Sequence, residues 1–217
     1  MCIRDRWPSS VALARGVAGV VMDVEGEGTE RATDGDRSWA SLAGLNVCDV
    51  GAGLGLAGLA AAKRGASSVS FYDREPLALQ CCLLSAEANG LTVAVGHAGT
   101  VSDRTDADRT VCVAEVFDWN AVSADQRTFD LVLACDVLYE AHAVAPVAAL
   151  IPMLTNEAPR PGRWMLADPP DRAPKNRAAF LEKVKLDHGM ELVRERRETV
   201  TRAGSTDDVL VLDLRLR

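Results

Sequence analysis

A glycine-dense stretch constrains the fold of this chain more than any other feature. Residues 47–58 read Val-Cys-Asp-Val-Gly-Ala-Gly-Leu-Gly-Leu-Ala-Gly and continue into an Ala/Leu-rich segment that ends near Arg64. Glycine adopts positive φ and lets a ligand approach the main chain closely. The N-terminus of a following helix offers unpaired N–H groups and a partial positive charge. The stretch therefore predicts a strand, a tight loop and a helix N-terminus that together form a nucleotide-type cradle.

Strands and helices alternate along the chain. We expect seven strands, at 46–50, 68–72, 111–117, 129–134, 164–167, 191–200 and 208–216, and residues 92–95 are either a short additional strand or part of a loop. We expect helices at 8–21, 54–64, 76–89, 141–154 and 175–188, and loops at 23–37 and 96–110. Leucine recurs at every second position from 210 to 216, as a strand with one buried face requires. The order predicts an α/β fold: a Rossmann-like, doubly wound, mainly parallel seven-stranded sheet with a C-terminal antiparallel hairpin.

The length of 217 residues suits one domain with a sizeable core. Residues 1–6 belong to no recognisable element, and we interpret them as a non-native leader. A single domain over 7–217 is then expected, with an N-terminal helix and loop at 7–45 and the Rossmann-like core at 46–217. We expect a monomer.

Composition excludes several classes of function. The net charge of −7 argues against a nucleic-acid partner held by phosphate neutralisation. Apolar runs are too short for a transmembrane helix, and no secretory pattern opens the chain. The six cysteines include no C-x-x-C pair and form no metal-type cluster with the three histidines, so we expect no metal. These features favour the cytoplasm, with an organelle as the alternative if a targeting segment has been lost.

Two cofactor fingerprints overlap in the glycine stretch. Gly53, Gly55 and Gly58 have the G-x-G-x-x-G spacing of dinucleotide sites, and Asp73 lies 20 positions after Gly53, where a ribose-binding acid is expected. A lone match of this kind is weak, and glycine-rich turns also occur in α/β domains without any cofactor.

The second frame favours S-adenosylmethionine. It consists of Asp49, Gly51, Gly53 and Gly55, with an acid two residues before the first glycine. An extra carboxylate at this loop opposes a pyrophosphate, whereas S-adenosylmethionine carries a sulfonium and an ammonium that a carboxylate attracts. The chain is also too short for the separate catalytic domain that many dehydrogenases carry. We therefore predict that Asp49 and these glycines bind the methionine end of the methyl donor.

Further acids follow the later strands, whose carboxyl ends carry the ligands in open α/β sheets. We predict that Asp73 accepts hydrogen bonds from the ribose hydroxyls and Asp118 from the adenine amino group, with Trp119 beside the ring. Each acid also has an ordinary interpretation as a strand-end or turn residue, and Trp119 as a core aromatic.

The sequence resembles the seven-β-strand class I methyltransferases, and more narrowly the lysine methyltransferase-like group called methyltransferase family 16. The resemblance covers nearly the whole chain from Trp7 onward. It is carried by the motifs Trp-Pro-Ser-Ser at 7–10, Asp-Val-Gly-Ala-Gly-Leu-Gly-Leu-Ala-Gly at 49–58, Phe-Tyr-Asp-Arg-Glu-Pro at 71–76, Val-Phe-Asp-Trp at 116–119 and Phe-Asp-Leu-Val-Leu-Ala-Cys-Asp-Val-Leu-Tyr-Glu at 129–140. The last contains the D-x-x-Y signature of the group, at Asp136 and Tyr139.

The resemblance implies an S-adenosylmethionine-dependent N-methyltransferase that acts on a protein lysine. Asp136 and Tyr139 are then the catalytic residues that orient the acceptor amine, and Cys135 joins the cofactor-binding set. The alternative is that Asp136 only caps the next helix and Tyr139 only packs on the cofactor. A small-molecule acceptor, a non-catalytic cofactor-binding module and a nicotinamide-dependent reductase stay open as alternative functions.

The chain departs from the family pattern at three places. Asp49 stands where the family often has Glu, and Ser85 where an Asn is common. Residues 168–170, Asp-Pro-Pro, are similar to the D-P-P-Y motif of amino-group methyltransferases, but they follow the fifth strand and lack the aromatic residue. We interpret this segment as a turn that introduces the next helix, with a substrate contact as the alternative.

Overall fold

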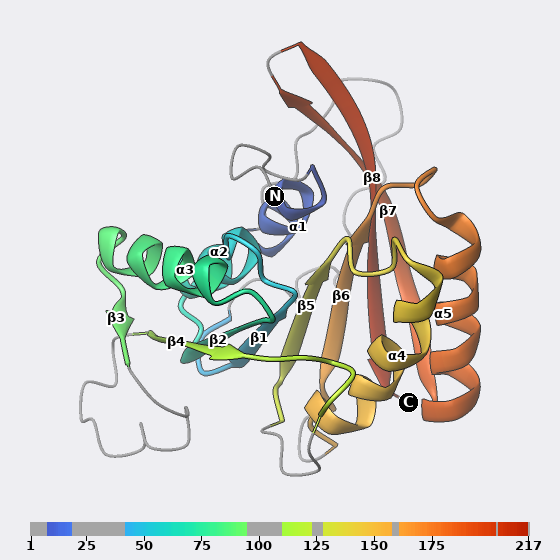
Figure 1. Cartoon of the computed structure of the whole chain (residues 1–217), viewed down its shortest axis with the longest axis horizontal. Coiled ribbons are helices and arrows are strands. Elements are labelled where there is room, and N and C mark those ends of the chain that lie inside the picture. The colour runs from blue at the N-terminus through green and yellow to red at the C-terminus, as the bar shows by residue number, and fades with distance from the viewer. Residues whose placement is uncertain are drawn as a thin grey trace.

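A single eight-stranded sheet organises the chain (Figure 1). The computed structural model describes residues 8–18, 42–94, 110–122, 128–157, 161–202 and 204–216. The strands are β1 (Asn46–Val50), β2 (Ser68–Asp73), β3 (Thr92–Val93), β4 (Val111–Val116), β5 (Leu131–Cys135), β6 (Arg163–Asp168), β7 (Met190–Arg202) and β8 (Ser205–Leu216). The helices are α1 (Pro8–Ala18), α2 (Leu56–Lys63), α3 (Pro76–Ala88), α4 (Val144–Leu154) and α5 (Pro174–His188), and a 3-10 turn, η3 (Ala141–Ala143), precedes α4.

The strand order is β3-β4-β2-β1-β5-β6-β8-β7. β1 to β6 pair in parallel, and β8 runs antiparallel to both β6 and β7. This confirms the Rossmann-like, doubly wound fold with its C-terminal hairpin. The sheet has eight strands rather than seven because the two-residue β3 pairs with β4 at the edge.

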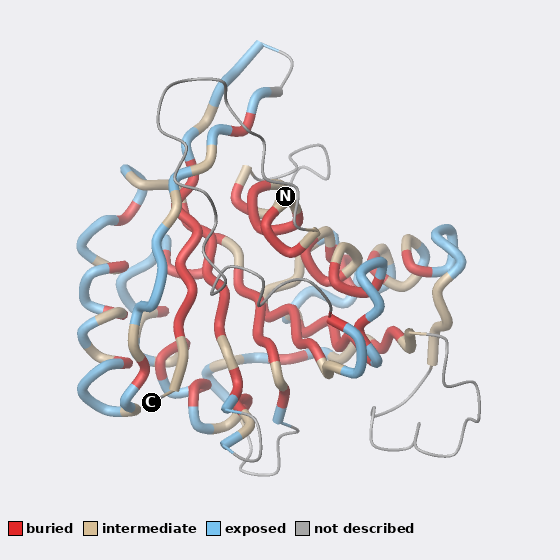
Figure 2. The backbone as a smooth tube through the Cα atoms, turned by 180° about the vertical axis from the view of Figure 1, so that it is seen from behind, coloured by how far each residue is buried: buried red, intermediate tan, exposed pale blue. Residues whose placement is uncertain are grey.

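The sheet separates two apolar cores. Alternate strand residues pack on one face against α1, α2 and α3, and on the other face against α4 and α5. In β1, for example, Val47 joins the first core, whereas Cys48 and Val50 join the second. Figure 2 shows the buried central strands between helices whose outer sides are exposed. Burial on both faces explains why the parallel strands read as continuous apolar runs.

Local signals fix the helix ends. Glu75 caps α3 by accepting a hydrogen bond from the Leu77 N–H at 3.3 Å, and Pro76 occupies the first helical position, where its missing N–H costs nothing. At the C-terminus of α5, Gly189 adopts φ +66°, the left-handed conformation that ends many helices. Both ends agree with the helices expected from the sequence to within one or two residues.

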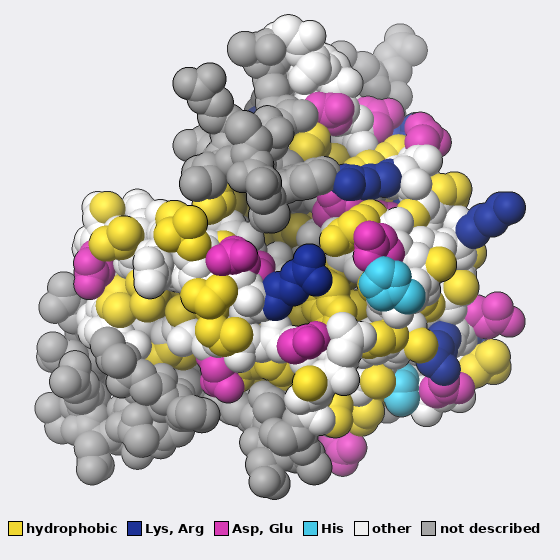
Figure 3. Space-filling model, viewed as in Figure 1, with side chains coloured by type: hydrophobic (Ala, Val, Ile, Leu, Met, Phe, Trp, Pro, Cys, Tyr) yellow, Lys and Arg dark blue, Asp and Glu magenta, His cyan; other side chains and the backbone are white. Residues whose placement is uncertain are grey.

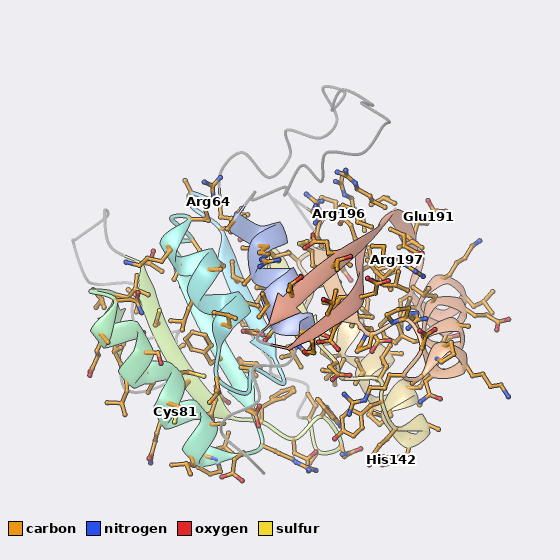
Figure 4. The ribbon with its side chains drawn as sticks, turned by 90° about the horizontal axis from the view of Figure 1, so that it is seen from above. Arg64, Cys81, His142, Glu191, Arg196 and Arg197 are labelled. Carbon is orange, nitrogen blue, oxygen red and sulfur yellow. The ribbon has the colours of Figure 1, made fainter. Side chains whose placement is uncertain are left out.

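The hairpin of β7 and β8 extends past the other strands, and α1 packs against its base (Figures 1 and 4). Gly16 of α1 lies so close to Arg196 of β7 that a Cβ there would come within 2.7 Å of the guanidinium. The first helix is therefore part of the sheet's covering layer. The leader at 1–6 and the loops at 23–37 and 96–109 lie outside the described residues, and the domain boundaries stay predictions.

None of the described helices is both long and apolar enough to cross a membrane.

Candidate active site

The glycine loop after β1 has the geometry of a ligand cradle. Gly51, Gly53 and Gly55 all adopt positive φ, at +65°, +54° and +72°. The Gly51 and Ala52 N–H groups both donate to the Tyr72 carbonyl, at 2.8 and 3.1 Å, which ties the loop to the end of β2. Gly55 then occupies the N-cap of α2 without any side-chain cap. The glycines are required because L side chains rarely adopt this conformation.

Gly55 and Gly53 have different structural roles in the loop. A Cβ on Gly55 would lie 2.8 Å from the Cys82 sulfur and 2.9 Å from Phe71 Cε1, so this glycine lets the loop pack against α3 and β2. A Cβ on Gly53 would meet no described atom within 4 Å. The backbone at Gly53 thus borders open space, as the close approach of a cofactor to the main chain requires. The loop fits the methyl donor predicted from the sequence.

Asp73 at the end of β2 ties the loop to α3. Its Oδ2 accepts a hydrogen bond from the Gly53 N–H at 2.8 Å, and its Oδ1 accepts one from the Glu75 N–H at 2.9 Å. A carboxylate has about four acceptor sites, so both oxygens keep capacity for ribose hydroxyls. The side chain is half-buried at the carboxyl edge of the sheet. Its contact with the ribose stays a prediction.

Asp49 lies beneath the loop. Its side chain is 2 % exposed, and its Oδ2 accepts a hydrogen bond from the Gly58 N–H of α2 at 2.8 Å. Burial raises the pKa of Asp49 to about 7; the Gly58 N–H opposes this rise and the charge of Asp73 adds to it. The structure therefore places this acid below the mouth of the loop, and its contact with the cofactor stays a prediction.

Trp119 and Asp118 follow β4 at the same edge. Trp119 packs half-buried on the second core, and its Cζ3 lies 3.5 Å from the position of a Cβ on Gly51. Asp118 is exposed, and its Oδ1 accepts hydrogen bonds from the Asn120 N–H at 2.9 Å and from Asn120 Nδ2 at 3.0 Å. These bonds lower the pKa of Asp118. Trp119 thus stands beside the glycine loop, while Asp118 forms an Asx turn.

Asp136 follows β5 in a strained and buried position. Its φ is +54°, and among the described residues it is the one non-glycine residue with positive φ. The residue as a whole is 9 % exposed, and Oδ1 is buried without a hydrogen-bond partner in the described part of the chain. Burial raises the pKa of Asp136 to about 6; Arg172 opposes the rise and Asp168 adds to it. Such strain is concentrated at functional sites.

Cys135 precedes Asp136 at the end of β5 and packs half-buried against the first core. Burial raises the pKa of its thiol well above its usual range, and the charges of Asp49 and Asp136 add to the rise. The thiol therefore stays protonated and neutral between these two acids. Its contact with the cofactor stays a prediction.

Tyr139 lies beside Asp136 with its side chain 44 % exposed. One guanidinium joins the two residues. Arg172 NH1 donates to Asp136 Oδ2 at 2.5 Å, and Arg172 Cζ lies 5.3 Å from the centre of the Tyr139 ring. That distance is within the range of a cation–π contact. The structure thus brings together the two residues of the D-x-x-Y signature and adds a third.

Sequence reasoning missed Arg172 and Arg177, although it singled out the Asp-Pro-Pro segment beside them. Asp168, the last residue of β6, is 1 % exposed, and its Oδ2 accepts a hydrogen bond from Arg177 NH1 at 2.6 Å. Arg177 also donates to the carbonyls of Pro169 and Pro170, at 3.1 and 2.7 Å. The Asp-Pro-Pro segment is therefore the turn into α5 that the sequence indicates. The signal for Arg172 is its place four residues after that strand-end acid.

Within the described residues, no group of three or more His, Cys, Asp or Glu side chains could hold a metal ion.

The surface in Figure 3 is hollowed near the middle of the face shown, and acidic, basic and hydrophobic side chains are interspersed around the hollow.

Comparison with known proteins places this geometry in context. A family model described as lysine methyltransferase matches residues 7–186. A search of curated proteins found no match.

Solved structures share the fold at low sequence identity. Magnesium protoporphyrin IX methyltransferase from Synechocystis PCC 6803, with bound S-adenosylmethionine, is 18 % identical with a TM-score of 0.61, over 97 % of this chain and 80 % of that one. A putative RNA methyltransferase from Pyrococcus horikoshii is 14 % identical with a TM-score of 0.59, over 98 % and 86 %. A ribosomal protein L11 methylase from Lactobacillus delbrueckii is 20 % identical with a TM-score of 0.52, over 96 % and 79 %.

Proposed function

Because this chain belongs to the lysine methyltransferase family, we propose that it is a protein-lysine N-methyltransferase in which Asp136 and Tyr139 hold the acceptor amine. Independently of this proposal, the chain is an S-adenosylmethionine-dependent methyltransferase. The predicted cofactor, S-adenosylmethionine, is thereby confirmed over a dinucleotide. The contacts of Asp49 and the glycines with this cofactor stay predictions.

The observation that carries the proposal is the state of Asp136. Its Oδ1 is buried without a partner among the described residues, which is costly unless a ligand supplies a hydrogen bond. The exposed ring of Tyr139 lies next to it and offers an apolar, electron-rich face. A lysine side chain has the complementary parts: an N–H donor for the carboxylate and a methylene stem for the ring.

The residues would act by positioning. S-adenosylmethionine supplies an electrophilic methyl group on a sulfonium. The acceptor amine, a cation in solution, must lose one proton to solvent and attack as the neutral form, with its lone pair in line with the S–CH₃ bond. The N–C bond would form as the S–CH₃ bond breaks and S-adenosylhomocysteine leaves. Asp136 Oδ1 would accept a hydrogen bond from an amine N–H and so turn the lone pair toward the methyl group, while Tyr139 excludes water beside it. The negative charge of Asp136 also stabilises the ammonium that forms on the acceptor.

We also propose roles for the residues that bind the cofactor. Gly53 borders open space, Gly51 lies beside the Trp119 ring, and Asp73 keeps acceptor capacity at the loop. We assign the methionine end to the loop with Asp49 beneath it, the ribose to Asp73, and the adenine to Trp119 and Asp118, with Cys135 lining the donor site.

The test is methyl transfer into a cell lysate from S-adenosylmethionine with a labelled methyl group, followed by mass spectrometry. We expect label on lysine side chains of protein, lost when the protein fraction is digested and removed. Asp136→Asn should lower transfer by about a hundredfold or more and leave the affinity for S-adenosylhomocysteine, measured by calorimetry, unchanged. Asp187→Asn is the matched control, because this acid is paired with Lys183 on α5 away from the site.

Two results would overturn the proposal. Label found only in small molecules would make the acceptor a small molecule, the alternative left open by the sequence. Full activity of Asp136→Asn would remove the role assigned to this carboxylate.

A further inference from the structure

Arg172 contacts both residues that the proposed function assigns to the acceptor. Its guanidinium donates to Asp136 Oδ2 at 2.5 Å and lies 5.3 Å from the centre of the Tyr139 ring. A carboxylate and an aromatic face are the two groups that a cationic side chain seeks. An acceptor lysine, a cation in solution, would seek the same pair. The arginine therefore already makes the contacts that the proposed function requires of the substrate.

The backbone that carries Arg172 is firmly held. The turn between β6 and α5 is tied to the buried Asp168–Arg177 pair and to the carbonyls of Pro169 and Pro170. Asn176 Nδ2 donates to the Leu138 carbonyl at 2.9 Å, which joins the start of α5 to the segment that bears Tyr139. The position of Arg172 beside the site is thus built into the fold.

The side chain of Arg172 extends to the protein surface. Arg172 is 34 % exposed, against 6 % for its partner Asp136. The long arginine side chain can swing outward while its backbone stays fixed, whereas Asp136 is confined by its burial. An exchange of cations on Asp136 would therefore move the arginine and not the carboxylate.

We propose that Arg172 is an internal competitor for the acceptor amine, so that a lysine side chain binds Asp136 and Tyr139 by displacing this guanidinium. The inference rests on the proposed function. Two cations on one buried carboxylate would repel each other, and one face of the Tyr139 ring accommodates one of them. Arg172 thereby satisfies Asp136 in the absence of substrate and weakens the binding of amines that make no other contact with the enzyme. The acceptor must then gain affinity from contacts outside the site, as a lysine within a protein does.

The test uses n-butylamine, a cation near neutral pH, as a probe for the lysine side chain. Its affinity for the protein saturated with S-adenosylhomocysteine is measured by NMR titration. We expect Arg172→Gln to bind the amine about three- to tenfold more tightly than the wild type. Arg172→Lys retains a competing cation and should stay closer to the wild type. In the wild type, the Arg172 guanidinium signal should move toward that of a solvated arginine as the amine is added.

Arg197→Gln is the matched control. Arg197 is also an exposed arginine opposite an acid, since its NH1 lies 3.4 Å from Asp208 Oδ2 on the hairpin, and its loss should leave the amine affinity unchanged. Circular dichroism and S-adenosylhomocysteine affinity verify that each variant is folded.

The outcomes separate the inference from the proposed function. If the amine binds the wild type and Arg172→Gln equally, or binds Arg172→Gln more weakly, Arg172 is no competitor, while the proposed function stands. If the amine binds neither protein, or binds Asp136→Asn as well as the wild type, Asp136 is not the acceptor site, and the proposal and the inference fail together.

Discussion

The carboxyl edge of the sheet consists of two halves that hold their acids in different ways. We call the loops after β1 and β2 the donor half, after their proposed role, and there Asp49 and Asp73 accept hydrogen bonds from backbone N–H groups. We call the loops after β5 and β6 the acceptor half, again after their proposed role, and there Asp136 and Asp168 are bonded to arginine side chains. Backbone donors are fixed by the fold, whereas a guanidinium on a long side chain can leave. The donor half is thus held by the main chain, whereas in the acceptor half the exposed guanidinium of Arg172 is the group that we propose to exchange.

The unpartnered oxygens follow the same division. Both oxygens of Asp73 are bonded to the main chain. Oδ1 of Asp136 and Oδ1 of Asp168 are both buried without a hydrogen-bond partner in the described part of the structure. The acceptor half therefore has buried carboxylate oxygens that accept no hydrogen bond in the described structure, whereas each oxygen of Asp73 already accepts one. This is where an additional donor, such as a substrate amine, would gain most.

The largest effect should come from breaking the buried ion pair of the acceptor half. Arg177→Met leaves the Asp168 carboxylate buried without its cation, and we expect it to lower the free energy of unfolding by about 3–5 kcal/mol. Denaturant unfolding measures the loss. The double variant Asp168→Asn/Arg177→Met removes the uncompensated charge and should recover part of it. A single variant as stable as the wild type would show that backbone contacts, and not this pair, hold the turn.

The next largest effect is expected in the donor half, where substitutions of Gly55 and Gly53 should lower the free energy of unfolding by different amounts. Gly55→Ala combines a left-handed φ with a Cβ 2.8 Å from the Cys82 sulfur, and should cost about 2–4 kcal/mol. Gly53→Ala has the same backbone strain but no neighbour within 4 Å, and should cost only about 1–2 kcal/mol. Calorimetry should show the reverse order for cofactor affinity, because the added methyl group of Gly53→Ala projects into the space assigned to the cofactor. Equal cofactor losses in the two variants would contradict this assignment.

The same division determines how much the sequence could predict. The donor half depends on local pattern: glycines after an apolar run, then an acid at the end of the next strand. Each signal lies within a few residues of the structure it produces, so the loop, the helix it opens and the place of Asp73 follow directly from the sequence. The buried position of Asp49 does not, because which face of β1 it occupies depends on the packing of Gly58 against the sheet.

The acceptor half was only partly predictable. Asp136 and Tyr139 were identified by the D-x-x-Y signature within one segment. Arg172 reaches them from the turn that follows another strand. Only the pairing of β5 with β6 brings Asp168, the partner of Arg177, next to Asp136. Long side chains that meet across two loops leave no periodic signal in the sequence. The sequence indicated a short strand at 92–95 as one possibility, and its pairing with β4 makes residues 92–93 the eighth strand of the sheet.

The stability of the protein should depend on pH through Asp49 in the donor half. Folding raises the pKa of this acid from 3.8 to about 7, so between these values the folded state binds a proton more readily than the unfolded chain. The stability of the wild type therefore falls as the pH rises through this window. Asp49→Asn lacks this dependence and keeps an oxygen for the Gly58 N–H. The linkage is about 1.4 kcal/mol per pKa unit, and the cost of burying the amide is the same at every pH and does not change it.

We expect Asp49→Asn to gain on the order of 2 kcal/mol over the wild type between pH 5 and pH 8. Thermal unfolding of both proteins across this range measures the difference. Asp136, whose pKa is also raised, is present in both proteins, so its contribution cancels. If the difference in stability between the wild type and Asp49→Asn does not change with pH, Asp49 is not the group that titrates in this range.

The smallest effect should decide what Asp118 does. Its carboxylate is exposed and bonded only locally, to Asn120, so the two interpretations left open by the sequence differ in one measurable respect. If Asp118 accepts a hydrogen bond from the adenine, Asp118→Ala should weaken S-adenosylhomocysteine binding about three- to tenfold, as expected for one hydrogen bond. Asn120→Ala disturbs the same turn but keeps the acid, and should leave the affinity within about twofold of the wild type. Equal losses in both variants would mean that the turn matters only as the support of Trp119, whose ring lies beside Gly51. The adenine would then be held by packing rather than by a charged acceptor, and the donor half would bind the base through its shape.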